Sequence, residues 1–125
     1  MAEYDMNLYD VEEVPGNDDL VAGAGSVCAA VPVVQGEYAR GDVLMSNADG
    51  EFVPATLAGL AAAKEVCLMG RTFTAGLDGT NAVCFFTGRF RMRAVRIGGS
   101  VMSGLSGSEQ SQVVAYLRQH KIFLV

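Results

Sequence analysis

Short apolar runs, separated by Gly, Pro and Asp residues, follow one another from residue 26 to the end of the chain. Runs of this length, bounded by turn-forming residues, are typical of β-strands. We expect the pair Asp49-Gly50 to make a tight turn. We also expect the fourth and fifth runs to pair antiparallel, because a polar turn separates them. The predicted strands lie at residues 26–31, 42–46, 52–53, 64–73, 81–87 and 122–125.

Two stretches predict helices instead. Ser106 and Glu109 have the spacing of a capping box, and Val113, Val114 and Leu117 then share one helical face, so a helix is expected over residues 108–119. The Ala- and Leu-rich stretch 56–63 predicts a turn or two of helix with Thr56 as its cap, although Gly59 weakens that prediction. The pattern as a whole indicates a mainly β protein with short helices.

Residues 1–20 differ from the rest, with seven acidic side chains, no basic one and neither a strand nor a helix period. Tyrosines and aliphatic residues are nevertheless spaced through this segment. We interpret it as an N-terminal arm that becomes ordered on a partner, followed by one domain over residues 21–125 with a glycine-containing hinge at 22–26. A disordered acidic tail is the alternative. The candidate contact residues of the arm are Tyr4, Leu8, Tyr9, Val11, Glu12, Glu13, Asp18 and Asp19.

Composition fits a single small domain of 125 residues, half of them apolar. No apolar stretch is long enough to span a membrane, and the first residues lack the pattern of a secretory signal, so we expect a cytosolic product without a membrane partner.

Charge is uneven along the chain: residues 1–51 hold eleven acidic side chains against one arginine, whereas residues 52–125 hold eight basic side chains against three acidic ones. Cys28, Cys67 and Cys84 have apolar neighbours and no C-x-x-C spacing, which predicts buried free thiols.

The run at residues 89–93 alternates basic and apolar side chains. As a strand it would place Arg89, Arg91 and Arg93 on one face and Phe90 on the other. Nucleic-acid binding is disfavoured, because the whole chain is acidic and Phe90 could not stack beside the arginines. We interpret the three arginines as a basic strand face that takes part in an interface.

Candidate catalytic and metal-binding residues are few. His120, the one histidine, lacks the motif of a nucleophile–base pair, and we interpret it as a helix-end residue. Asp18 and Asp19 lack the other ligands of a calcium loop. Ala22-Gly23-Ala24-Gly25-Ser26 precedes a strand, whereas a phosphate-binding loop follows one. We therefore expect no enzymatic activity, no cofactor and no metal.

The order of the segments resembles that of the head decoration proteins of tailed bacteriophages, the family that includes the head decoration protein of phage lambda. The resemblance covers about Val33 to Val125, and the arm matches in character only. It rests on four segments, followed by a helix and a terminal apolar strand: Gly41-Asp42-Val43-Leu44-Met45-Ser46, Phe52-Val53-Pro54-Ala55-Thr56, Glu65-Val66-Cys67-Leu68-Met69 and Thr87-Gly88-Arg89-Phe90-Arg91.

This resemblance implies a small barrel-like β domain with short helices and an extended N-terminal arm. It further implies a homotrimer that binds as a cement at three-fold sites of the expanded head, with residues 1 to about 20 lying on the major capsid protein. The protein would be assembled in the host bacterial cytoplasm and would lie on the outer surface of the virion. A small β-barrel ligand-binding or regulatory module, and an accessory domain of an enzyme, are the alternative functions.

Overall fold

The computed structural model describes residues 20–23 and 25–125. These residues form a mainly β structure, with 41% strand and 22% helix. No described helix is long and apolar enough to cross a membrane. In chain order the elements are β2 (Val27–Pro32), β3 (Gly36–Tyr38), β4 (Val43–Ser46), β5 (Phe52–Pro54), α1 (Leu57–Leu60), β6 (Val66–Met69), β7 (Phe73–Ala75), β8 (Asn81–Phe90), η1 (Met92–Ala94), β9 (Arg96–Ile97), β10 (Ser100–Val101), η2 (Met102–Gly104), α2 (Gly107–Gln119) and β11 (Ile122–Leu124).

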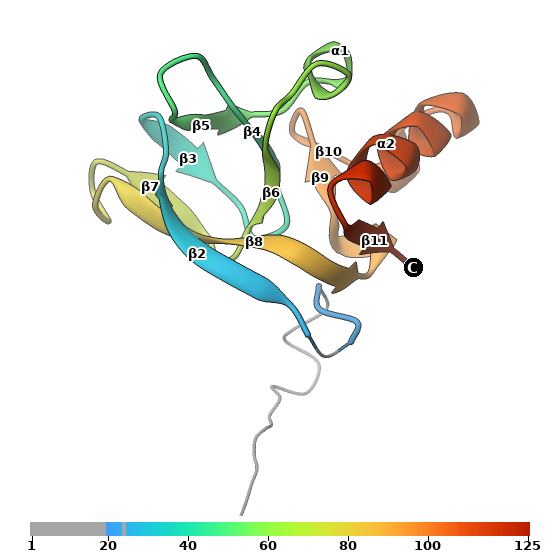
Figure 1. Cartoon of the computed structure of the whole chain (residues 1–125), viewed down its shortest axis with the longest axis horizontal. Helices are drawn as coiled ribbons and strands as arrows, with labels where there is room; N and C mark the ends of the chain where they lie inside the picture. Colours follow the sequence, from blue (N-terminus) through green and yellow to red (C-terminus); the bar gives the residue numbers. More distant parts are fainter. Residues whose placement is uncertain (1–19, 24) are drawn as a thin grey trace, which may run out of the picture.

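The main sheet is built around the long strand β8 (Figure 1). Its strands lie in the order β11-β8-β6-β4-β5, and β2 also pairs with β8. The strand predicted over residues 64–73 is interrupted after Met69, and its last residue begins β7, which does not pair with β8. The first part, β6, pairs antiparallel with β8 as predicted, whereas β11 runs parallel to β8. β3 pairs with β7, and β9 with β10, in two separate two-stranded sheets.

The strands do not close into the barrel that the sequence interpretation expected. One isolated bridge, between Val33 and Phe52, joins the chain after β2 to the far edge strand β5. It does not extend into a ladder, and Pro32 beside it has no N–H to donate. The described strands therefore form an open sheet whose two edges meet at one point.

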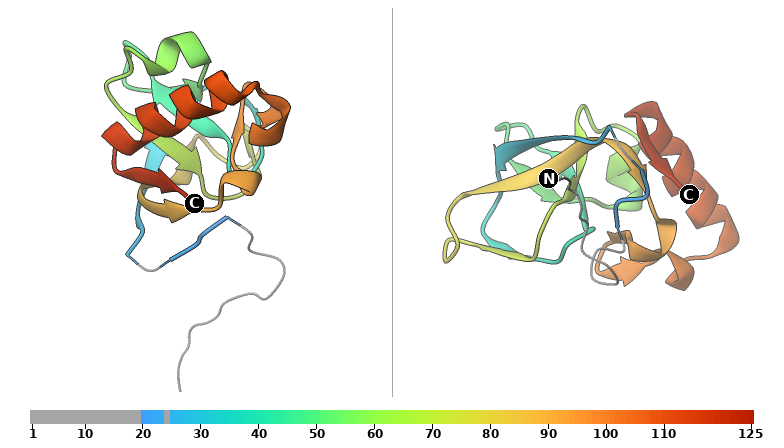
Figure 2. Two further views of the ribbon diagram at one scale, coloured as in Figure 1. Left: turned by 90° about the vertical axis from the view of Figure 1, so that its right-hand side faces the viewer. Right: turned by 90° about the horizontal axis from the view of Figure 1, so that it is seen from below.

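The sheet separates two apolar clusters, and β6 shows how. Val66 and Leu68 belong to the cluster that contains Val113 and Leu117 of α2, whereas Cys67 and Met69 belong to the cluster that contains residues of β3 and β7. This alternation follows from the period of two along a strand. Figures 1 and 2 accordingly show α2 beside β11 at one end of the molecule and the paired strands β3 and β7 at the other.

Both predicted helices are present. The capping box of α2 is formed, because the Glu109 N–H donates to Ser106 Oγ (3.2 Å) and the Ser106 N–H donates to Glu109 Oε1 (3.1 Å). His120 is the C-cap of α2, which confirms its interpretation as a helix-end residue. The Gly59 N–H donates to Thr56 Oγ1 and caps α1, which is a single turn.

Candidate functional site

The candidate residues of the arm, from Tyr4 to Asp19, lie outside the residues that the structure describes. The structure does show where the segment that follows them joins the domain. Leu20, which the sequence interpretation assigned to the arm, is only 2% exposed and packs in the cluster beneath α2. The arm is therefore attached to the domain through a core residue.

Residues 20–22 extend the sheet along the last residues of β8. The Arg91 N–H donates to the Leu20 carbonyl (2.7 Å), the Ala22 N–H donates to the Arg89 carbonyl (2.9 Å), and the Arg91 guanidinium donates to the Val21 carbonyl (2.9 Å). Val21 also forms an antiparallel bridge with Phe90. These bonds fix the point at which the acidic segment leaves the domain, immediately beside Arg91.

The predicted strand over residues 89–93 is wrong beyond Phe90. β8 ends there, and the chain turns into the 3₁₀-helix η1 at Met92. Two local hydrogen bonds close this turn: the Ala94 N–H donates to the Arg91 carbonyl (3.0 Å), and the Val95 N–H donates to the Met92 carbonyl (3.1 Å). Arg89 lies on β8, Arg91 precedes η1 and Arg93 lies on η1, so the three do not form one strand face.

A shallow trough runs beside α2, next to the point where residue 20 joins the sheet. Its first hollow has a volume of about 540 Å³, and a second, of about 270 Å³, shares Met92 and Gln110 with it and continues along the helix. Among the described residues, no Asp or Glu lines either hollow. We call the two hollows together the α2 trough, and its lining is Arg91, Met92, Arg93, Met102, Ser103, Gly107, Gln110, Ser111, Val114, Ala115, Arg118 and Val125.

The edge strand β2 is exposed and carries no charge. Among the described strands it pairs with β8 alone, and five of its six residues are exposed, with Val31 partly buried. Val83, which lies opposite Ala30 on β8, is 47% exposed. An uncharged edge of this kind is a template for pairing with another chain.

The cysteine prediction is correct for two residues and wrong for the third. Cys67 and Cys84 are buried, whereas Cys28 is exposed, because none of the elements in the described part of the chain packs over β2. A hydrogen bond with Cys84, together with burial, raises the pKa of the Cys67 thiol well above its ordinary value. Cys67 is therefore held in its unreactive, protonated form.

These environments predict how the thiols react. In the native protein at pH 8 we expect at most one thiol per chain, Cys28, to react with a thiol reagent such as DTNB, and all three to react in guanidinium chloride. The variant Cys28→Ser should then show no native reaction. Fast reaction of a second thiol in that variant would contradict the burial of Cys67 and Cys84.

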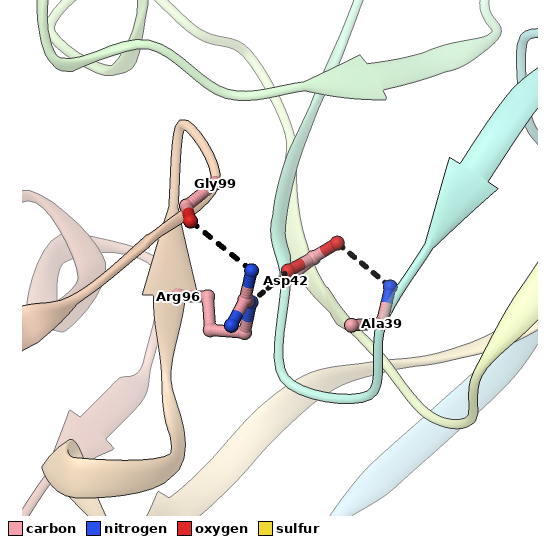
Figure 3. A network of polar contacts seen from close by, with 4 residues as sticks. All are labelled: Ala39, Asp42, Arg96 and Gly99. Carbon is pink, nitrogen blue, oxygen red and sulfur yellow. Dashed lines mark hydrogen bonds and ion pairs between the residues drawn. The ribbon is translucent and has the colours of Figure 1, made fainter.

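Asp42, which belongs to the first segment of the family resemblance, has a structural role (Figure 3). Asp42 accepts a hydrogen bond from the Ala39 N–H (2.8 Å) and forms an ion pair with Arg96 (3.2 Å), whose guanidinium also donates to the Gly99 carbonyl. It thereby ties the β3–β4 turn to the β9–β10 hairpin. Burial, with Asp42 as a lesser cause, raises the pKa of nearby Tyr38.

No protein-family model matches the chain. No curated protein is similar enough in sequence to be matched either.

Sequence reasoning missed the anchoring of Leu20 and the α2 trough. Leu20 is one apolar residue after an acidic stretch, and nothing in the local pattern marks it as a core residue. The trough combines residues from η1, η2, α2 and the chain end, and only the tertiary fold brings these together. The exposure of β2 had no such signal either, because an apolar run without alternation is typical of a strand that is buried on both faces.

Proposed function

We propose that the chain is a non-enzymatic decoration protein of a tailed-phage head. It binds as a homotrimer at three-fold sites on the outer surface of the expanded shell and stabilises it. The arm, residues 1 to about 20, contacts the major capsid protein. The domain over residues 21–125 forms the body of the trimer.

One observation carries this proposal, namely the exposed and uncharged edge strand β2. Single exposed apolar residues are common on protein surfaces, but an unprotected edge strand is normally blocked by charge, proline or a covering element. Here Val27, Cys28, Ala29 and Ala30 are all exposed, and the one proline stands at the end of the strand. Such a strand suits a protein whose role is to assemble with other chains.

The way the arm joins the domain supports its proposed role. Residues 20–22 already pair with the end of β8, so the acidic segment continues from the edge of a sheet. A segment that starts in this manner is well placed to add a strand to a partner's sheet, with its backbone supplying affinity and its side chains specificity. Its carboxylates would add attraction to a basic groove on that partner.

The segments that carry the family resemblance also fall into hydrogen-bonded elements in the expected order. Three of them contain β4, β5 and β6, the fourth forms the end of β8, and α2 and β11 close the chain. Gly41 and Asp42 stabilise a turn between two sheets, which gives a physical reason for that pair at that place. This agreement supports the proposed fold relationship.

A substitution on β2 tests the assembly surface. Ala30→Lys places a charge on the exposed edge, which should convert a trimer at micromolar concentration mainly into monomer. Ala48→Lys is the matched control, because Ala48 is an exposed alanine in the turn between β4 and β5. Light scattering measures the mass. Retention of three chain masses by Ala30→Lys would place the trimer interface elsewhere.

The proposed function itself is tested by mixing. The purified protein is added to undecorated heads, expanded and unexpanded, of the phage or prophage that encodes it, and the bound fraction is measured by sedimentation. We expect saturable binding to expanded heads and increased resistance of those heads to heat. The absence of binding to either form would overturn the proposal.

A further inference from the structure

We propose that the α2 trough is a docking site for the chain's own acidic segment, residues 12–19, when the protein is free in solution. The proposal needs no capsid and does not depend on the proposed function. Its occupant is fixed by charge, by apolar content and by the place where the segment joins the domain.

The charges of the trough and of the segment are complementary. Arg91 and Arg93 line one hollow, and Arg118, which is exposed, lines the other. The acidic side chain of α2's first turn, Glu109, accepts from its own capping partner Ser106. Segment 12–19 carries two pairs of carboxylates, one at each end, and no basic residue. Each pair of carboxylates can therefore meet an arginine at one end of the trough, and the attachment of the segment to Leu20 sets its direction.

The apolar surfaces correspond as well. Between the arginines the trough is lined by Met92, Met102, Val114 and Ala115, of which Met102 is buried at its floor. Methionine side chains adapt readily to an irregular apolar ligand. The segment offers Val14 and Pro15 between its two acidic pairs. A segment with acidic side chains alone would have no apolar group to pack against this floor.

The lengths allow both ends to be engaged together. Gly107 and Arg118, the outermost helical residues of the trough, are separated by a helical rise of about 16 Å. The stretch from Glu13 to Asp18 spans about 17 Å when extended. Asp19 precedes Leu20, whose carbonyl accepts from the Arg91 N–H (2.7 Å). In the proposed docked state the pair Asp18 and Asp19 lies near Arg91 and Arg93, and the pair Glu12 and Glu13 reaches Arg118.

Tethering makes weak contacts sufficient. Exposed ion pairs contribute little individually and are screened by salt. A segment attached one residue from its site has an effective concentration in the millimolar range, so a few such pairs and a small apolar contact can populate the docked state. A separate acidic peptide without the tether would bind far more weakly.

The test is paramagnetic relaxation in the full chain. Cys28→Ser removes the exposed thiol, and Val11→Cys accepts a nitroxide label, while Cys67 and Cys84 are buried. We expect line broadening at the amides of Val114 and Arg118, and none at Thr74 on β7, at the other end of the molecule (Figure 1).

The control is an arm of equal length without charge. Replacing Glu12 and Glu13 by Gln, and Asp18 and Asp19 by Asn, should reduce the broadening in the trough at least threefold, and 0.5 M NaCl should do the same. On the domain, Arg118→Gln should reduce it about twofold, whereas Lys64→Gln, the same charge change outside the trough, should not.

Two results would overturn the proposal. Equal broadening with the acidic and the neutral arm would show that the tether alone brings the label near α2. Broadening in a mixture of ¹⁵N-labelled protein without nitroxide and unlabelled protein with nitroxide would show that the occupant is the arm of another copy.

Discussion

Gly41→Ala is expected to destabilise the domain by about 3 kcal/mol or more, and to lower its Tm by roughly 12–20 °C. Gly41 has a left-handed φ of 94°, and a Cβ built on it would lie 2.3 Å from the carbonyl oxygen of Ala94. The backbone cannot move away without loss, because the Gly41 N–H donates to the Met69 carbonyl (2.9 Å) and its carbonyl accepts from the Arg96 N–H (3.0 Å). The substitution therefore separates η1 and β9 from the main sheet.

Gly50→Ala is the matched control for this substitution. Gly50 has a similar φ of 82°, but a Cβ there meets no atom within 4 Å. It therefore measures the backbone strain alone, about 1 kcal/mol. Thermal or urea unfolding gives both values. Equal losses for the two variants would contradict a steric role for Ala94.

Deletion of residues 2–18 is expected to abolish detectable binding to expanded heads, an affinity loss of at least about 100-fold, or roughly 3 kcal/mol. The deletion stops at residue 18 because Leu20 is a core residue whose carbonyl accepts from Arg91. The domain should therefore keep its unfolding midpoint within a few degrees. Sedimentation with heads and thermal unfolding measure the two effects.

A charge variant separates the two contributions of the arm. With Glu12, Glu13, Asp18 and Asp19 replaced by their amides, binding to heads should weaken and lose most of its salt dependence, but persist. The apolar side chains and the backbone of the arm remain in this variant. Full affinity of the deletion variant would instead assign head binding to the domain.

The elements that were predicted correctly are those that a short stretch of sequence determines by itself. The capping box of α2 needs only Ser106 and Glu109, and the strands β4, β6 and β8 follow from apolar runs bounded by turn residues. The antiparallel pairing of β6 with β8 was predicted as well, although the polar turn joins β7, and not β6, to β8.

The misplaced features depend on distant partners. The alternation at residues 89–93 was a correct pattern, but Met92 and Ala94 pack against the cluster beneath α2, and the chain turns into η1 there. Cys28 is exposed because its strand lies at an edge, and the period of a sequence does not show which strand is outermost. The prediction of a closed barrel was wrong because closure depends on one strand pairing, between segments about 20 residues apart, which a local pattern does not show.

Electron cryomicroscopy of expanded heads saturated with the protein tests the proposed function most directly. The account predicts added density of three chains at each three-fold site, in contact with capsid protein through the N-terminal segment and with neighbouring copies through β2. Heads without added density, or density centred on the five-fold or six-fold positions, would contradict it.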